Sequence, residues 1–228
     1  GAAGRALEAS HLGRIDPDQV GSLLAHHYAR AGDGPKAVSW LMHAARRSFR
    51  LNALEEALVT LGQAVEQLPR IEDPESRDRE TVAVVHQQVQ SLVWLGRLRE
   101  VGPLLEAHTP TVVRIDEPGL SARHFFWLGL GHCLLGALGP AGIHGRRARS
   151  EATRSGDRHV EGNAHFLLAL NAYSASDPHA GVEHGEWAVE LLEGSLEPGW
   201  LGLSWWVLGA NYGELGEMRR ALGCERRA

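Results

Sequence analysis

The sequence predicts an all-α fold, a superhelical solenoid of stacked helical hairpins, on three observations. Apolar residues recur with helical spacing, while the alternation that is typical of strands is nearly absent. Gly and Pro residues divide the chain into segments of helix length. Residues of similar kind recur at a common interval of 39 positions in the second half. Together these features indicate helical hairpins that bury their apolar faces on one another.

The first predicted block spans residues 1–69 and contains several helices. Asp33-Gly34-Pro35 ends one helix and begins the next, and Asn52 plays the same part before a helix over 53–68. Pro69 ends that helix, because proline cannot continue its hydrogen-bond ladder. The helix carries an apolar stripe with steps of three and four residues, formed by Leu54, Ala57, Leu58, Leu61, Ala64, Val65 and Leu68.

The second block, residues 70–119, is predicted to be a linker followed by a divergent helical hairpin. Residues 69–80 are rich in charge and contain two prolines, and a second break is expected around 109–119, at Pro110 and Pro118. Trp94-Leu95-Gly96 is suggestive of the repeat pattern, but its register departs from that of the other repeats.

The third block, residues 120–228, holds the repeats. Four columns of residues share the interval of 39, which predicts two helices in each unit: Trp127, Phe166 and Trp205; Leu134, Tyr173 and Tyr212; Gly131, Leu170 and Gly209; and Ile143, Val182 and Ala221. The middle repeat departs from the pattern, with Leu170 at the position of a small residue and Asp177 at the position of the turn glycine.

The last repeat, Trp205-x2-Leu208-Gly209-x2-Tyr212-x3-Gly216-x4-Ala221, resembles the tetratricopeptide pattern. A large aromatic residue fills the gap between helices, and small residues permit close helix approach. The first half of the pattern recurs from Trp127 to Leu134. The same offsets are seen near the start of the chain, at Leu24, Tyr28, Gly32, Ala37, Leu41 and Ala44, and in part at Ala57, Leu61, Ala64 and Pro69. The resemblance implies a right-handed superhelix whose concave wall is lined by the first helix of each repeat.

A more particular resemblance is to the helical-repeat arms of bacterial signalling ATPases, of the kind related to the maltose-type LuxR activator or fused to nucleotide-cyclase domains. Residues 4–8 and 23–28 are similar to the start of such arms, and residues 36–68 to the next two helices. The resemblance implies a sensor or regulatory arm that follows an ATPase core. We therefore expect residues 1–69 to follow a core that is missing here, and the repeats of 120–228 to be truncated.

Charge and cysteine content restrict the class of protein. The chain of 228 residues has 23 basic and 28 acidic residues, a net charge of −5, which argues against a basic surface for nucleic acid. Lys36 is the only lysine, and Cys133 and Cys224 are the only cysteines. Two cysteines make no disulfide framework, and no leader peptide precedes them, so we expect a cytoplasmic protein. One alternative is a membrane protein built around 125–143, which are 19 residues without formal charge.

Motifs for catalysis, cofactors and metals are not found. Gly34-Pro35-Lys36-Ala37 lacks the remainder of a phosphate-binding loop, and no H-E-x2-H, paired C-x2-C or G-x-S-x-G motif occurs. His179, Glu183 and Glu186 share a helix face, but solvated helix surface explains them better than a metal site. We therefore predict a non-catalytic protein with no cofactor and no metal.

Recognition of a partner is the function that these features favour. The positions that the tetratricopeptide resemblance places on the concave wall are Gln19, Ser22, His26, Arg30, Phe125, His132, Asn171, Ser174, Trp206 and Glu214. Polar groups with a few aromatic rings suit a protein, a peptide or a small effector, and the nucleotide-binding core of the parent chain is a further expected partner. The alternative is a free-standing adaptor that bridges two proteins.

Overall fold

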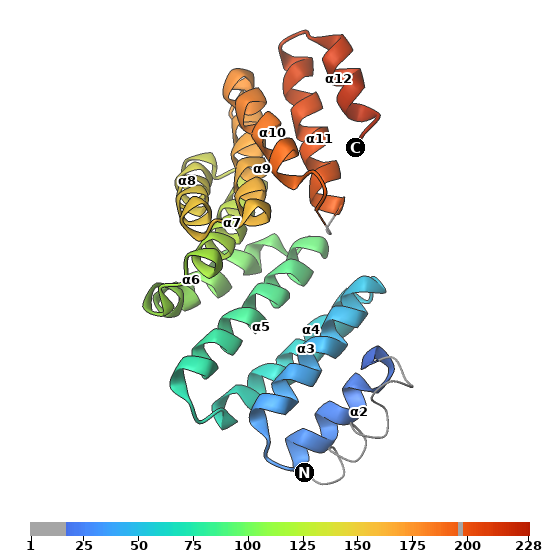
Figure 1. Ribbon diagram of the computed structural model, residues 1–228, viewed down its shortest axis with the longest axis vertical. Helices are drawn as coiled ribbons and strands as arrows, with labels where there is room; N and C mark the ends of the chain where they lie inside the picture. The colour runs from blue at the N-terminus through green and yellow to red at the C-terminus, as the bar shows by residue number, and fades with distance from the viewer. Residues whose placement is uncertain (1–16, 196–197) are drawn as a thin grey trace. The chain divides into compact units, whose positions relative to one another are not determined.

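A computed structural model describes residues 17–195 and 198–228, with the backbone alone at 17–20 and 22. These residues form eleven α-helices and one short 3-10 helix, and the described ranges contain no strand (Figure 1). The prediction of an all-α chain is confirmed, and the contacts between successive helices fit a helical repeat. None of the helices in the described ranges is both long and apolar enough to cross a bilayer, 125–143 included.

The chain divides into two compact units, unit 1 (Gly1–Glu100) and unit 2 (Val101–Ala228). This division differs from the three predicted blocks. The expected linker at 69–80 holds a 3-10 turn and the beginning of a long helix. Pro110, expected in a break, lies inside the helix over 98–115, and the chain turns after it at Asp116, whose φ is 50°.

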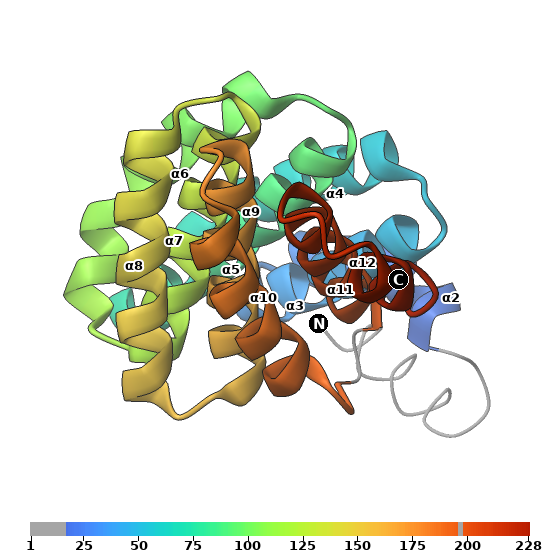
Figure 2. The same ribbon diagram turned by 90° about the horizontal axis from the view of Figure 1, so that it is seen from above.

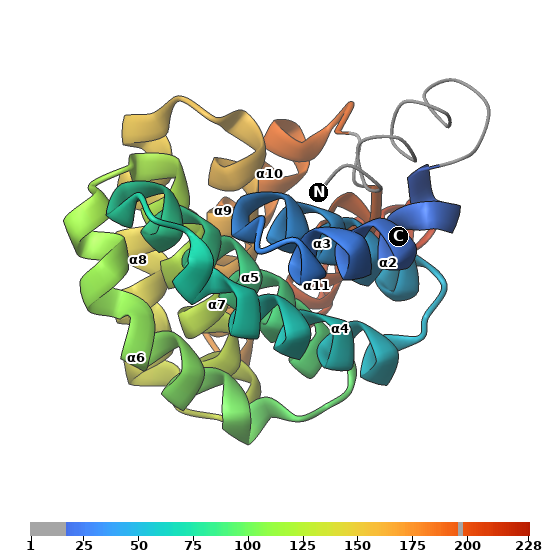
Figure 3. The same ribbon diagram turned by 90° about the horizontal axis from the view of Figure 1, so that it is seen from below.

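In the described part of unit 1, from residue 17 onward, α3 packs against both α2 and α4, and α4 packs against α5 (Figure 3). As predicted, the chain breaks at Asp33, whose carboxylate accepts a hydrogen bond from the Lys36 amide and caps α3, while Pro35 occupies its first turn. The core centres on Val38, Leu41 and Leu61. The elements are α2 (Pro17–Arg30), α3 (Gly34–Arg50), α4 (Leu54–Gln67), η1 (Leu68–Arg70) and α5 (Pro74–Trp94).

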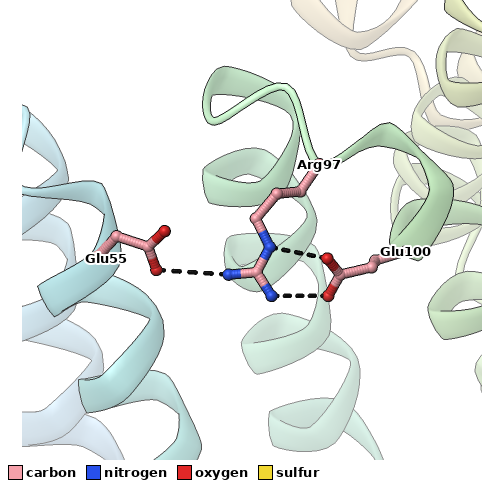
Figure 4. Close-up of polar contacts among 3 residues, drawn as sticks. All are labelled: Glu55, Arg97 and Glu100. Atoms are coloured by element: carbon pink, nitrogen blue, oxygen red, sulfur yellow. Dashed lines mark hydrogen bonds and ion pairs between the residues drawn. The ribbon is translucent and has the colours of Figure 1, made fainter.

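An exposed ion-pair network ties the beginning of α4 to the turn after α5. The Arg97 guanidinium donates from Nε and Nη2 to the two carboxylate oxygens of Glu100, at 2.7 and 2.8 Å. Its Nη1 donates to Glu55 of α4 at 3.4 Å (Figure 4). The hydrogen bond from Arg97 holds the pKa of Glu100 below its ordinary value. Because all three groups are exposed, this network contributes little to the free energy of unfolding.

Unit 2 is a series of helix pairs that follow one another along the chain. Pairs α7–α8, α9–α10 and α11–α12 each pack closely, α9 also contacts α7 and α11, and α8 and α10 contact the next pair (Figure 2). The elements are α6 (Leu98–Ile115), which begins at the boundary, α7 (Pro118–Leu134), α8 (Leu138–Ser155), α9 (Arg158–Ser174), α10 (Pro178–Leu192), α11 (Pro198–Glu214) and α12 (Met218–Glu225).

The helix boundaries repeat every 40 residues, one more than the predicted interval. The second helices begin at 98, 138, 178 and 218, and the first helices of the last three pairs at 118, 158 and 198. The turns between the helices contain a left-handed residue at the same interval, at Gly96, Gly136, Ser176 and Gly216. Gly96 is therefore in register with the later turns, and the turn residue of the middle repeat is Ser176 rather than Asp177.

This difference of one residue changes which side chains are equivalent. One residue is a rotation of about 100° on a helix, so the aromatic column at 39 drifts around the helix surface. Trp127 and Phe166 are buried, but Trp205 is half-buried. The column at the interval of 40 is instead Phe125, His165 and Trp205. Phe125 and His165 each contact a ring on the second helix of their own pair, and Trp205 packs against a cluster that includes Cys224 of α12.

Candidate functional site

A cleft that contains predicted site residues lies in unit 1, between α2 and α4. His26 and Arg30 are both exposed on α2, at positions that share one face of the helix. Gln19 and Ser22 belong to the same helix, but their side chains lie outside the described residues. His26 and Arg30 each line a hollow of unit 1.

This surface, called here the α2–α4 cleft, consists of two adjoining hollows of about 340 and 420 Å³. Leu41 of α3, nearly buried, forms part of the floor. Both hollows share Ala29 and Gln67. The first is lined by Ala25, His26, Ala29, Leu41, Thr60, Gln63, Glu66 and Gln67, and the second by Ala29, Arg30, Gly32, Gln67 and Arg70.

The side of the cleft that α4 provides is lined by side chains that can form hydrogen bonds. Thr60, Gln63 and Gln67 are three and four residues apart, so the helix presents them on one side. The Oε1 atom of Gln67 is buried and has no hydrogen-bond partner. Arg70 closes one end of the cleft by donating from Nη1 to the Ala29 carbonyl at 2.5 Å. A buried acceptor without a donor costs about 1–3 kcal/mol.

The predicted residues of unit 2 do not gather on one surface. Phe125 is buried between α7 and α8, where its ring stacks on His144 at 5.9 Å and is covered by Arg147 at 3.8 Å. It cannot line an exposed wall, and this prediction is wrong. His132 is half-buried and stacks on the same His144 ring at 5.4 Å.

The remaining predicted residues are spread along α9 and α11. Asn171 is half-buried and packs on α8, where a Cβ at Gly142 would lie 3.2 Å from its Nδ2. Ser174 is exposed and donates to the Leu170 carbonyl at 2.9 Å, and Glu214 is exposed at the end of α11. Trp206 is 41% exposed and lies 6.4 Å from the ring of Tyr173. Of the two aromatic residues Phe125 and Trp206, only Trp206 is exposed.

A second cleft, called here the α10–α12 cleft, was not predicted. It measures about 460 Å³ and has an aromatic floor and an acidic side. Tyr212 donates to Glu186 at 2.5 Å, and burial together with this carboxylate raises the pKa of Tyr212 to about 12. Arg220 and Arg227 lie over the Tyr212 and Trp205 rings, at 5.2 and 4.7 Å. The lining residues are Glu186, Val189, Glu190, Glu193, Trp205, Leu208, Tyr212, Arg220, Gly223, Cys224 and Arg227.

The only sequence signal for this cleft is the spacing of Glu186 and Glu190, which places two carboxylates on one side of α10, with Glu193 directly after the end of the helix. Such a stripe is ordinarily read as solvated surface, and only the positions of α11 and α12 show that it borders a hollow. The two cysteines do not add a reactive group to either cleft, since burial raises the pKa of both the Cys133 and Cys224 thiols.

Histidines are concentrated inside unit 2. His124 is fully buried, with Nε2 3.0 Å from the Thr109 hydroxyl, and burial lowers its pKa to about 4. Burial also lowers the pKa of His144. Among the residues that the structure describes, no three His, Cys, Asp or Glu side chains are placed to hold a metal ion. These histidines are therefore neutral packing groups at pH 7.

No protein-family model matches the chain, and no curated protein matches its sequence. Among solved structures, the chain is similar to BtubC (BKLC) from P. vanneervenii, with a TM-score of 0.70 and 16% sequence identity. The match covers 92% of this chain and 84% of that chain. At this identity the likeness concerns the fold alone, and the chain therefore shares an all-helical fold with BtubC.

Proposed function

We propose that this chain is a non-catalytic scaffold that binds a protein or peptide partner, and that it is the sensor or regulatory arm of a bacterial signal-transduction ATPase or transcriptional regulator. The expected setting is the cytoplasm, with the nucleotide-binding core of the parent chain as one partner and neither nucleic acid nor membrane as another. The repeat is proposed to be tetratricopeptide-like and to form a right-handed solenoid. The recurring left-handed turn residues and the interval of 40 between helix pairs support this assignment.

The α2–α4 cleft carries the proposal of binding. Its walls come from two helices of unit 1 and offer an imidazole, an exposed guanidinium and side-chain amides around a small apolar floor. The unpartnered Oε1 of Gln67 is the most specific feature, because rotation of this carboxamide into the cleft would let a peptide N–H or a side-chain donor satisfy it. A ligand here acts on the parent protein only by binding two of its states with different affinity.

The test uses the complete reading frame that encodes the chain. If a nucleotide-binding core precedes Gly1, that core is titrated calorimetrically against the chain and against the variants Arg30→Ala, His26→Ala and Gln67→Met. Each should weaken binding by about 1 kcal/mol or more, roughly fivefold. Arg46→Ala, at an exposed site on α3 outside the cleft, is the matched control and should bind as the unmodified chain does.

Stability separates a binding role from a structural one. Gln67→Met keeps the length of the side chain and removes the unpartnered oxygen, so it should raise the free energy of unfolding by about 1 kcal/mol while it weakens binding. Arg30→Ala and His26→Ala should leave the melting midpoint nearly unchanged. If all three variants bind the core as the unmodified chain does, the α2–α4 cleft is not the binding site.

The alternative function, a free-standing adaptor that bridges two partners, is supported by the α10–α12 cleft. Both units then carry a cleft among their described residues, and the two clefts differ in chemistry, since the second has three carboxylates and two arginines around aromatic rings. The adaptor is favoured if no nucleotide-binding core lies in frame and two partners bind at once. Glu190→Gln should then affect one partner and Arg30→Ala the other.

A further inference from the structure

His165 of α9 and His184 of α10 form a hydrogen bond between their Nδ1 atoms, which are 3.2 Å apart. The ring centroids are 5.1 Å apart and the rings are inclined by 64°. His165 is 7% exposed, and His184 is half-buried. Because both atoms are Nδ1, one ring must donate its proton and the other must accept with its lone pair. The two neutral rings therefore hold different tautomers.

The surroundings of this histidine pair oppose positive charge. Burial is the main cause that lowers the pKa of both rings, that of His165 to about 4. Arg149 of the preceding helix α8 acts on both rings in the same direction, and Glu183 of α10 acts on His184 in the opposite one. The indole of Trp187, on α10, lies 6.1 Å from His165. Neither α7 nor α11 contributes a charge that acts on the pair.

The neighbouring helix pairs show what this position does. Forty residues before, Phe125 and His144 stack at 5.9 Å between α7 and α8, and forty residues after, Trp205 of α11 packs against a cluster that includes Cys224 of α12. In each pair the contact joins the first helix to the second. Of these three contacts in the described residues, only that of α9 and α10 depends on a hydrogen bond between two groups that titrate.

We propose that the contact between His165 and His184 is a pH-sensitive device that holds α10 against α9 and releases it on acidification. When both rings are protonated, each Nδ1 carries a hydrogen, so the hydrogen bond is replaced by two facing N–H groups and two like charges. Opening of the helix pair exposes both rings to water and takes up two protons from solvent. Because α10 supplies Glu186, Glu190 and Glu193, its release removes the acidic side of the α10–α12 cleft.

Hydrogen exchange on the whole chain tests this inference. Between pH 6.5 and pH 5, His165, with a pKa of about 4, makes opening more favourable by about 15-fold, and the lowered pKa of His184 adds to this increase. We expect the amides of α9 and α10 to show this increase after correction for intrinsic exchange. The double variant His165→Phe with His184→Cys uses residues from the equivalent positions 125 and 224 and should lose most of it. His179→Ala, at an exposed histidine of α10, should behave as the unmodified chain.

Two results would overturn the proposal. One is a pH dependence of α9 and α10 that is equal in the double variant and the unmodified chain, since other groups would then cause it. The other comes from the unmodified chain alone and does not require the variant to fold. Nitrogen-15 spectra at pH 7 should show one of the two rings protonated at Nδ1 and the other at Nε2, and two rings protonated at Nε2 would exclude the hydrogen bond.

Discussion

Replacement of Gly181 with alanine tests how closely the helices of unit 2 pack. Gly181 is buried on α10, and a methyl group at this position would overlap the carboxamide of Asn211 on α11. Asn211 is fully buried and cannot move freely, because its Nδ2 donates to the Val207 carbonyl at 2.8 Å. Either α10 and α11 must separate, or the carboxamide must leave its place and lose this hydrogen bond.

The expected cost is the sum of two effects. Overpacking of a well-packed interior costs about 1–3 kcal/mol, and loss of the buried hydrogen bond adds about 1 kcal/mol. Gly181→Ala should therefore lower the free energy of unfolding by about 2–4 kcal/mol. Urea denaturation followed by circular dichroism measures this difference, with Gly102→Ala as the control. A methyl group at Gly102 of α6 meets no atom within 4 Å, so this change should stabilise by up to about 1 kcal/mol.

A double-mutant cycle makes the prediction specific to the contact. Asn211→Ala removes the carboxamide and makes room for the methyl group, so Gly181→Ala should cost much less in that background. The interaction free energy should be about 2 kcal/mol. If Gly181→Ala changes stability as Gly102→Ala does, or if the free-energy changes at 181 and 211 are additive, then Gly181 and Asn211 do not approach each other closely.

Three further outcomes are expected. Ser176→Gly should raise the free energy of unfolding by about 0.5–1 kcal/mol, because serine at a φ of 57° is strained and glycine is not; an unchanged denaturation midpoint would contradict this. His124 stays neutral in the folded chain, since its pKa of about 4 lies below the ordinary 6.5, so stability is lost as the pH falls from 6.5 towards 4. Urea unfolding should show about 2 kcal/mol less stability at pH 5 than at pH 7 from this group, and His124→Phe should remove that part. Arg97→Gln should raise the pKa of Glu100 towards its ordinary value, and a carboxyl NMR titration that shows no change would mean that the ion pair is not populated in solution.

Local signals in the sequence were sufficient for several helix boundaries. Asp33 with Pro35 begins α3, Asn52 adopts a φ of 58° between α3 and α4, and Pro69 falls in the 3-10 turn after α4. Each of these depends on a cap, a left-handed residue or a missing amide, which act within one turn of helix. Such features are decided by a few neighbouring residues, so they can be predicted without tertiary contacts.

The register of the repeat could not be predicted in the same way. The aromatic residues recur at 39, but the turn residues Gly96, Gly136 and Gly216 are in register at 40. The turn is the better signal, because the left-handed conformation restricts its residue type, whereas several neighbouring positions of a buried helix accept an aromatic ring. At position 176 the left-handed turn residue is serine, so a search for glycine in the sequence misses this turn. The result is that Phe125, predicted to line a wall, lies between two helices.

Asn171 and Asn211 show why a polar residue at a repeat position does not by itself mark a binding site. The two are 40 residues apart, both pack on the preceding helix beside a glycine, and both have a buried Oδ1 without a partner. Gln67 has the same unpartnered oxygen, but it lines a cleft. Its replacement by methionine should therefore change binding as well as stability. Asn211→Leu removes a buried carboxamide that no binding partner can contact, so this change should alter stability alone. The comparison of the two variants separates a polar residue that serves packing from one that serves recognition.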